Sequence, residues 1–523
     1  MKSVKYIFSA IAVSFAMTAC VGDLDVTPID PNSNTADKVL VSEEAFTQYL
    51  AGIYTGYATP GYKGANGDPS ISGLDGGASQ YVRGLYNLNV LTTDESVCGW
   101  NDQTIKDLHW MTWTTADVFI YSFYSRVFMQ ISSANEFIRQ ARASSVDFAD
   151  KEEYIAEARV LRALSYLHAI DNFGNVPFAD ETAVVGQFPD QISRGDLFDW
   201  LEGELLDIIS NSAISEARAN GYGRVDKGVA RFILAKLYLN AEVYKGVAKY
   251  NECASVLRDL MADGYSLHTT PNGSIYSAYQ DLFLADNDTC TDEIIFGIGQ
   301  DGVNTTSYGV TNYLIFAAVG GSMDPAAFGI SSGWGGLRTT PEFYDKFSGA
   351  DARRLFWDNT NSTDQQKEID DIGEFTHGYA FMKFRNMKSD GTPGKELGFV
   401  DTDFPMMRYA DVLLMAAECQ ARGASIDGLG AFNQVRARAG LSGVSSLSLS
   451  EIIDERGREL YMEGWRRSDL IRFGLFTTAD YLWSWKGDTK AGRAVDSYRN
   501  LFPIPDSDRL ANSKLTQNEG YTN

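Results

Sequence analysis

The stretch EEYIAEARVLRALSYLHAI, residues 152–170, is the clearest indication of the fold. Its apolar residues recur mostly at three- and four-residue steps, which places them on one face of a helix and predicts packing against a core. The pattern ends at Asn172-Phe173-Gly174, and Pro177 follows, as expected where a helix stops. A long amphipathic helix is therefore the first element of the predicted frame.

A second pair of helices follows the first. Asp226 can cap VARFILAKLYLNAEVY, residues 229–244, and KYNECASVLRDLM, residues 249–261, comes after a short break. Two antiparallel helices of this length resemble a tetratricopeptide hairpin, although the 34-residue spacing of that repeat is not strict. We therefore expect a mainly α fold, a bundle of helical hairpins with few short strands.

The helical texture returns near the C-terminus. Ser448-Leu449-Ser450-Glu451 fits a capping box that opens one long helix. Asp454 with Arg458, and Glu463 with Arg467, have the i,i+4 spacing of ion pairs on a helix surface. We interpret this charge run as a salt-bridged helix face and not as a catalytic group.

The whole helical frame is expected mainly over 42–57, 116–265 and 408–474. Between these blocks, glycine is dense over 59–84 and 297–336, which predicts long loops and short strands because glycine weakens helices. Binding residues commonly lie on loops held by a rigid frame. The ligand region is therefore expected mainly over 58–115 and 273–400, within a single domain of residues 41–523.

The N-terminal residues MKSVKYIFSAIAVSFAMTAC are typical of export. A basic start, a short apolar run and small residues before a cysteine indicate a signal peptide over 1–19 and a lipidated Cys20, followed by a tether over 20–40. Met17 departs from the commonest pattern for lipoproteins. The alternative is a secreted protein cut elsewhere, in which Cys20 has no role.

Composition excludes several classes of protein. The 523 residues are 44% hydrophobic with a net charge of −24, which argues against a disordered chain and against nucleic acid as a partner. Four scattered histidines without HExxH spacing predict no metal site, and no cofactor is expected. Disulfides stay open among the cysteines beyond Cys20, which are Cys98, Cys253, Cys290 and Cys419.

Three short motifs imitate functional sites. The GxGxxG at 297–302 lacks the helix that a dinucleotide site needs after it, and the GxSxG at 329–333 precedes two glycines where a helix should begin. Asp286-Asn287-Asp288 hints at a calcium loop, but Gly297 stands where the bidentate glutamate should be. We therefore expect none of the three to work as its motif suggests.

Seven phrases in order resemble the SusD/RagB family of surface nutrient-binding lipoproteins. They are EEAFTQYLAGIYTGY (43–57), EARVLRALSYLHAIDNFGNVPF (157–178), GRVDKGVARFILAKLYLNAE (223–242), FPMMRYADVLLMAAECQA (404–421), NQVRARAGL (433–441), ERGRELYMEGWRRSDLIRFG (455–474) and FPIP (502–505). The resemblance covers essentially the whole chain. It implies a tetratricopeptide-like helical bundle with an irregular half that carries the ligand face.

The resemblance also implies a function and a partner. A lipoprotein of this kind is anchored in the outer membrane, faces the cell exterior, captures an oligosaccharide and hands it to a TonB-dependent barrel of the SusC type, without catalysis. Capture of peptides or glycopeptides by the same architecture is the alternative. A secreted glycan-cleaving enzyme is a third hypothesis. Such an enzyme needs a pair of catalytic carboxylates, and no local sequence signature indicates one.

A sugar needs an aromatic plate for its C–H face and fixed partners for its hydroxyls. The segment 72–108 resembles the family segment that contacts ligand in starch-binding members, which suggests starch-like glucans first. The candidate ligand-binding residues are Asp75, Arg83, Trp100, Asn101 and Gln103, with Tyr308 and Trp334 from the second glycine-rich window. The alternative is that Trp100 and Tyr81 are core rings and that Asp75 is a turn residue.

Overall fold

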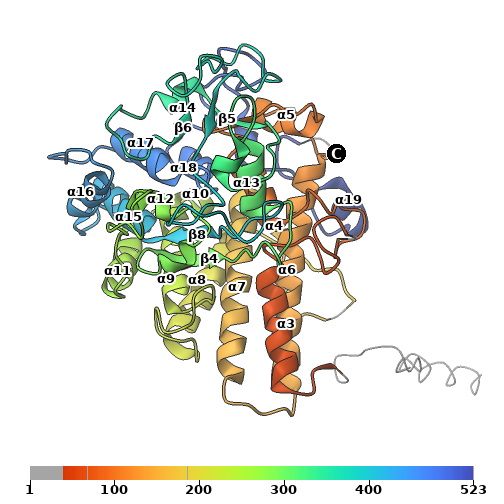
Figure 1. Ribbon diagram of the computed structural model, residues 1–523. Coiled ribbons are helices and arrows are strands. Elements are labelled where there is room, and N and C mark those ends of the chain that lie inside the picture. The colour runs from red at the N-terminus through yellow and green to blue at the C-terminus, as the bar shows by residue number, and fades with distance from the viewer. Residues whose placement is uncertain (1–38, 68, 185, 522–523) are drawn as a thin grey trace, which may run out of the picture.

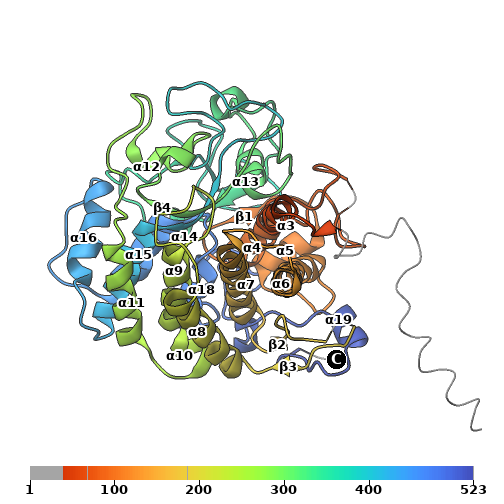
Figure 2. The same cartoon turned by 90° about the horizontal axis from the view of Figure 1, so that it is seen from below.

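A stack of antiparallel helices forms the frame of the protein. The computed structural model describes residues 39–521 except 68 and 185. In the stack, each helix packs on the next, and Figure 2 shows several of them nearly end-on. The stack consists of α6 (Val118–Ala143), α7 (Lys151–Asn172), α8 (Arg194–Asn211), α9 (Lys227–Leu239), α11 (Tyr250–Ala262), α15 (Tyr409–Ala421) and α16 (Gly428–Arg438).

Local sequence explains where these helices begin. The Asp117 carboxylate accepts hydrogen bonds from two backbone N–H groups at the start of α6, and Asp226 accepts one at the start of α9, as predicted. Helix α7 is buried along most of its length because α3 (Glu43–Thr55), α6, α8 and α9 all pack against it. The mainly α frame of helical hairpins is confirmed.

The irregular half lies over one end of the long helices (Figure 1). Its helices are short, and its strands have two to five residues. The α-helices outside the stack, apart from α3, are α4 (Tyr81–Asn89), α5 (Gln103–Trp110), α10 (Ala241–Lys245), α12 (Ala278–Asp281), α13 (Val310–Ala318), α14 (Pro341–Tyr344), α17 (Leu449–Leu460), α18 (Arg466–Arg472) and α19 (Asp506–Ala511). The strands are β1 (Val97–Cys98), β2 (Val176–Pro177), β3 (Gln191–Ile192), β4 (Ile294–Ile298), β5 (Leu337–Thr339), β6 (Phe356–Trp357), β7 (Tyr379–Phe381) and β8 (Phe404–Arg408).

The strands form three small antiparallel sheets, in the orders β1-β5-β7-β6, β2-β3 and β4-β8. In the first sheet Cys98 of β1 stands opposite Leu337 of β5. This pairing joins two segments more than two hundred residues apart in sequence. It fixes the loops that leave these two strands beside each other.

The prediction of loops and short strands is wrong at two places. Helix α13 lies inside the glycine-rich window 297–336, and α4 begins inside the window 59–84. All nine residues of α13 are buried, so apolar packing stabilises this helix between flanking glycines. The high average glycine content of 297–336 therefore did not indicate the short apolar helix within it.

The predicted C-terminal helix is also broken. Ser448 caps α17 as expected, but the helix ends at Leu460, and α18 begins only at Arg466. Between them Met462 and Gly464 have φ angles of 65° and 85°, in the left-handed region that interrupts a helix. The chain therefore turns at YMEGW.

The predicted surface ion pairs of this segment are wrong too. Asp454 pairs with Lys346, and Glu463 is buried against Arg408 and Lys383. Arg458 pairs with Glu455. The i,i+4 rule assumed a solvent-facing helix, whereas this helix contributes to a buried charge network.

One buried apolar cluster runs from Leu40 to Leu515 and includes residues of both the frame and the irregular half. None of the helices in the described part of the chain has the length and hydropathy to cross a membrane. The predicted signal peptide, Cys20 and nearly all of the tether lie outside the described residues, so this division of the chain stays a prediction.

Candidate functional site

Trp100 and Trp334 meet where β1 and β5 end. Since Cys98 stands opposite Leu337, the residues that follow β1 lie beside those that precede β5. The Gly99 N–H donates to the Gly336 carbonyl at 3.0 Å and extends this pairing. The Trp100 indole N–H then donates to the Trp334 carbonyl at 3.2 Å. The two rings lie 6.3 Å apart between centroids, at an angle of 50°.

Tyr308 adds a third ring. Its centroid lies 6.1 Å from that of Trp334, and all three rings are partly exposed. We call Trp100, Tyr308 and Trp334 the ring platform. Partly exposed aromatic rings with a packed underside can offer a face to a ligand. The structure therefore brings together the three aromatic residues predicted from sequence.

Backbone hydrogen bonds hold the Trp334 loop on α13. The N–H groups of Trp334, Gly335 and Gly336 donate to carbonyl oxygens at the end of α13 and just beyond it, at distances of 2.7 to 2.9 Å. A Cβ atom at Gly336 would lie 2.8 Å from the Trp100 ring. Glycine at this position therefore lets the indole pack directly on the backbone.

Arg83 lies beneath the platform on α4. Its guanidinium is 4.4 Å from the centroid of the Tyr313 ring and 5.8 Å from that of Trp100. Its Nη1 donates to the carbonyl oxygens of Gly77 at 2.8 Å and Tyr308 at 3.3 Å. Arg83 thus joins α4 to both loops and fixes the backbone on which the Tyr308 ring stands.

The Arg83 guanidinium still has unused donors. Only 8% of the residue is exposed, its Nε is buried without a partner, and its Nη2 makes no hydrogen bond to a described residue. Burial lowers the pKa of Arg83, although the group stays charged. A buried cation with free donors can bind a ligand oxygen that reaches it.

The remaining predicted site residues are not joined to the rings by hydrogen bonds. Asp75 accepts from the Gly77 N–H at 2.7 Å, which is the turn role that the sequence left open, although its charge also acts on Arg83. Asn101, just before α5, accepts a hydrogen bond from Lys106, and Gln103 of α5 donates to Asp107; both residues are exposed. Their roles as ligand-binding residues stay predictions.

The sequence reasoning missed the rings that support the platform. Tyr313 and Phe316 of α13 lie 5.9 Å from Trp100 and 5.0 Å from Trp334, and Phe399 lies 5.3 Å from Tyr308. The run VTNYLIFAA carried the signal, because it is apolar on all sides like a buried helix. Tyr81 is fully buried, as its alternative core role requires.

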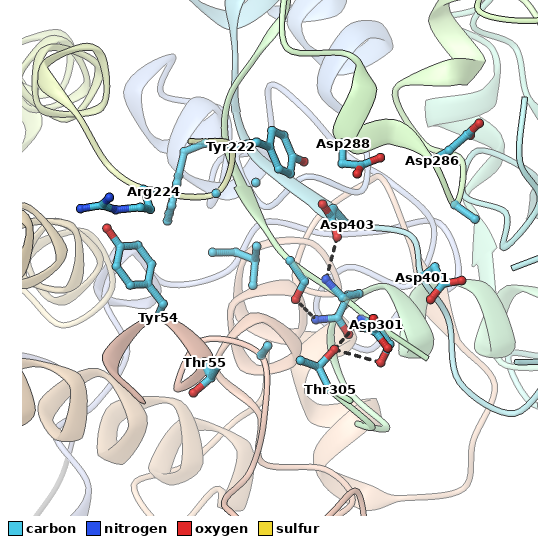
Figure 3. Close-up of a pocket in the computed structure, with 18 of the residues that line it drawn as sticks. Tyr54, Thr55, Tyr222, Arg224, Asp286, Asp288, Asp301, Thr305, Asp401 and Asp403 are labelled. Carbon is cyan, nitrogen blue, oxygen red and sulfur yellow. Dashed lines mark hydrogen bonds between the residues drawn. The ribbon is translucent and has the colours of Figure 1, made fainter. Parts of the chain in front are cut away.

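A separate cavity of about 540 Å³ lies between α3, the turn at Tyr222–Arg224 and β4 (Figure 3). Its lining includes Gly297–Asp301 from the GxGxxG motif and Asp286 and Asp288 from the segment similar to a calcium loop. No helix follows β4 until α13, so the expectation that GxGxxG does not form a dinucleotide turn is confirmed. The motifs are nevertheless close in space.

Within the described residues no group of three or more His, Cys, Asp or Glu side chains is arranged to hold a metal ion. The cysteines Cys98, Cys253, Cys290 and Cys419 are buried and unpaired. Burial raises the pKa of the Cys98 thiol to about 11, so this thiol beneath the platform is neutral.

A frame of helical hairpins that carries its loops at one end is the fold of the SusD-like proteins. The structure is similar to Surface glycan-binding protein A from Bacteroides thetaiotaomicron in complex with laminarihexaose, with a TM-score of 0.68, 20% identity and coverage of 91% of this chain and 100% of that one. A Laminarin binding SusD-like protein gives a TM-score of 0.70 at 22% identity, over 92% of this chain and 100% of that chain.

Sequence comparison finds a relative with higher identity than these solved structures. The chain is 33% identical to Starch-binding protein SusD of Bacteroides thetaiotaomicron over 575 aligned positions, which cover 99% of each chain. SusD-like protein P2 of Formosa agariphila is 25% identical over 77% of this chain and 81% of its own. The SusD family model matches residues 370–521. This chain belongs to the SusD family.

Proposed function

We propose that this protein is a non-catalytic, cell-surface glycan-binding lipoprotein. It captures an oligosaccharide on the ring platform and delivers it to a SusC-like TonB-dependent transporter in the outer membrane. Cys20 carries the lipid anchor in this proposal. Family membership supports the class of function, and the match to a starch-binding relative over nearly the whole chain supports a glucan as ligand.

The arrangement of Trp100, Tyr308 and Trp334 carries the proposal. Three partly exposed rings stand on loops that β-pairing, α13 and Arg83 hold in place. A pyranose can stack its C–H face on such rings while the free donors of Arg83 bind its hydroxyl oxygens. Because these loops are already held in place, binding loses little free energy to the ordering of the site.

Titration calorimetry against maltoheptaose and laminarihexaose, beside a reducing-sugar assay on the same samples, tests this function. We expect binding of at least one oligosaccharide and no release of reducing ends. Trp100→Ala should weaken binding by about 1–3 kcal/mol, as the loss of a stacked ring does elsewhere. Release of sugar by pure protein would make it an enzyme, and selective binding of a peptide panel would favour the alternative ligand.

The matched control is Phe188→Ala. Phe188 is an apolar ring that is 58% exposed, in the segment between β2 and β3 that packs on the C-terminal residues. Its removal should leave oligosaccharide affinity unchanged. Equal losses in both variants would mean that general ring exposure, and not the platform, accounts for binding.

A further inference from the structure

The cavity between α3, the turn at Tyr222–Arg224 and β4 shares no lining residue with the ring platform. Its volume of about 540 Å³ lies in the range usual for small-molecule sites. Tyr54 and Arg224 lie at one end of it, and Asp286 and Asp401 lie at the other (Figure 3). Its lining combines aromatic rings, carboxylates and lysines.

Three of the five aspartates in this cavity already have partners. Asp286 accepts hydrogen bonds from the N–H and the hydroxyl of Ser389. Asp401 accepts from two backbone N–H groups of neighbouring loops, and Asp301 pairs with Lys395 at 2.6 Å. These carboxylates hold the loops of the cavity together and are not free for a ligand.

Asp403 and Asp288 are different. Asp403 is only 5% exposed, and its Oδ1 accepts from the Gln300 N–H at 2.6 Å, while its Oδ2 has no hydrogen-bond partner and the carboxylate has no ion pair in the described structure. Asp288 is exposed, and its carboxylate makes neither a hydrogen bond nor an ion pair with a described residue. Both carboxylates line the cavity.

The position of Asp403 is fixed by Asn287. The Asp403 N–H donates to the Asn287 side chain at 3.1 Å, and the Asn287 amide donates back to the Asp403 carbonyl at 3.0 Å. Burial without a cation raises the pKa of the Asp403 carboxyl to about 7, and the nearby Asp288 adds to this effect. A hydrogen-bond donor in the cavity would therefore stabilise the ionised carboxylate.

Two other groups have unused hydrogen-bonding capacity. The Tyr222 hydroxyl is buried and makes no hydrogen bond to a described residue, and burial raises its pKa, with the neighbouring Asp403 carboxylate adding to this effect. The Lys388 ammonium, also in the lining, makes no hydrogen bond or ion pair with any residue that the structure describes. The cavity thus offers free acceptors, a free donor and a hydroxyl that can do both.

We propose that this cavity is a second saccharide site, which takes one or two neutral sugar units through hydroxyl bonds to Asp403, Asp288 and Tyr222. The inference rests on the proposed glycan-binding function and extends it to short sugars. Sugar hydroxyls both donate and accept, which matches the mixture of free groups. The rings of Tyr54 and Phe296, 6.5 Å apart, supply the apolar part of the lining.

The charges of the lining favour a neutral ligand over a cation. Lys388, a cation without an ion pair to any described residue, lies in the same lining and would repel an ammonium group or a metal ion, whereas Lys395 and Arg224 are already paired with Asp301 and Glu157. The carboxylates are also not arranged as metal ligands in the described residues. A hydroxyl group of a neutral sugar can donate a hydrogen bond to the Asp403 carboxylate without bringing a charge into the cavity.

Ligand-observed NMR with glucose, maltose, cellobiose and laminaribiose tests the site, with glucosamine and CaCl₂ as cationic probes. We expect at least one neutral sugar to bind, with affinity lowered tenfold or more by Asp403→Asn and severalfold by Tyr222→Phe. Lys388→Ala should lower the affinity severalfold without affecting folding, because this side chain has no structural partner. Phe188→Ala, an exposed ring outside both the cavity and the platform, should leave it unchanged.

Other results would overturn the inference. These are loss of short-sugar binding in Trp100→Ala but not in Asp403→Asn, binding of glucosamine or Ca²⁺ alone, or no short-sugar binding by a wild-type protein that binds maltoheptaose. Failure of the proposed function is distinguishable, because the wild-type protein would then bind no long oligosaccharide at all.

Discussion

The indole N–H of Trp100 donates to the carbonyl oxygen of Trp334, so the first ring of the platform is bonded to the backbone that carries the second. The two tryptophans therefore form one unit. The Phe316 ring packs against the Trp334 ring, with 5.0 Å between the two centroids. A change at either tryptophan should alter the position of the other.

This coupling is measurable in a double-mutant cycle. Trp100→Ala and Trp334→Ala should each weaken oligosaccharide binding by about 1–3 kcal/mol, and the double variant should lose less than the sum, with a coupling of at least about 0.5 kcal/mol. Calorimetry on the two single variants, the double variant and the wild type gives the four binding free energies that the cycle needs. Strict additivity would show that the two rings act independently.

Gly336→Ala tests the support of the platform without removing a ring. The added Cβ would lie 2.8 Å from the Trp100 indole, so the ring must move. We expect at least a threefold loss of oligosaccharide affinity, with a shift in tryptophan fluorescence. The control is Gly398→Ala, where a Cβ meets nothing within 4 Å. Unchanged affinity in Gly336→Ala would mean that the ring position is not critical.

The helical frame could be predicted from sequence because its signals are local. The stripe of apolar residues over 152–170 and the cap at Asp226 need no knowledge of distant contacts. Trp100 and Trp334 were found through resemblance, but their contact depends on the pairing of β1 with β5, two strands too short to leave a pattern. A site built by long-range pairing is not visible in any one segment.

The buried charges show the same limit. Arg408 is completely buried and bonds to Glu293, Glu459 and Glu463, which come from the turn before β4, from α17 and from the break after it. From the sequence alone, Glu463 is expected on a salt-bridged helix surface. Only the packing of α15, α17 and β8 reveals that these charged residues are in the core.

Removal of one member of this network should be costly. Arg408→Met removes the cation that three buried carboxylates share and leaves each with fewer cationic partners, namely Arg438 for Glu293, Arg438 and Arg353 for Glu459, and Lys383 for Glu463. We expect a loss of about 3–5 kcal/mol in the free energy of unfolding. Urea unfolding followed by circular dichroism measures it. In the control Lys490→Ala, an exposed pair with Asp370 is lost, and the change should be small beside that of Arg408→Met, because water screens an exposed pair. Similar values for both variants would contradict a structural role for the network.

His168 should make stability fall in mild acid. Burial lowers the pKa of its imidazole to about 4, while its Nδ1 lies 2.7 Å from the Tyr81 hydroxyl and its Nε2 is buried without a partner. The unfolded chain protonates this group near pH 6.5 and the folded chain only near pH 4. The unfolded state therefore binds the extra proton between these values, and stability present above pH 6.5 is lost as the pH falls.

The slope is about 1 kcal/mol per pH unit for one such histidine. Asp403, whose raised pKa gives the opposite slope over this range, is present in both proteins, so the His168 contribution is the difference between them. Urea unfolding at pH 7, 6, 5 and 4.5 should give a slope lower by about one proton in His168→Gln than in the wild type, whatever the substitution does to stability at pH 7. Carboxylates whose pKa is lowered to about 2, such as Glu181 beside Arg162, lose their contribution only below about pH 4.5 and so do not account for the change above pH 5. An unaltered slope in His168→Gln would show that the imidazole is protonated in the folded protein, with its charge satisfied inside the core.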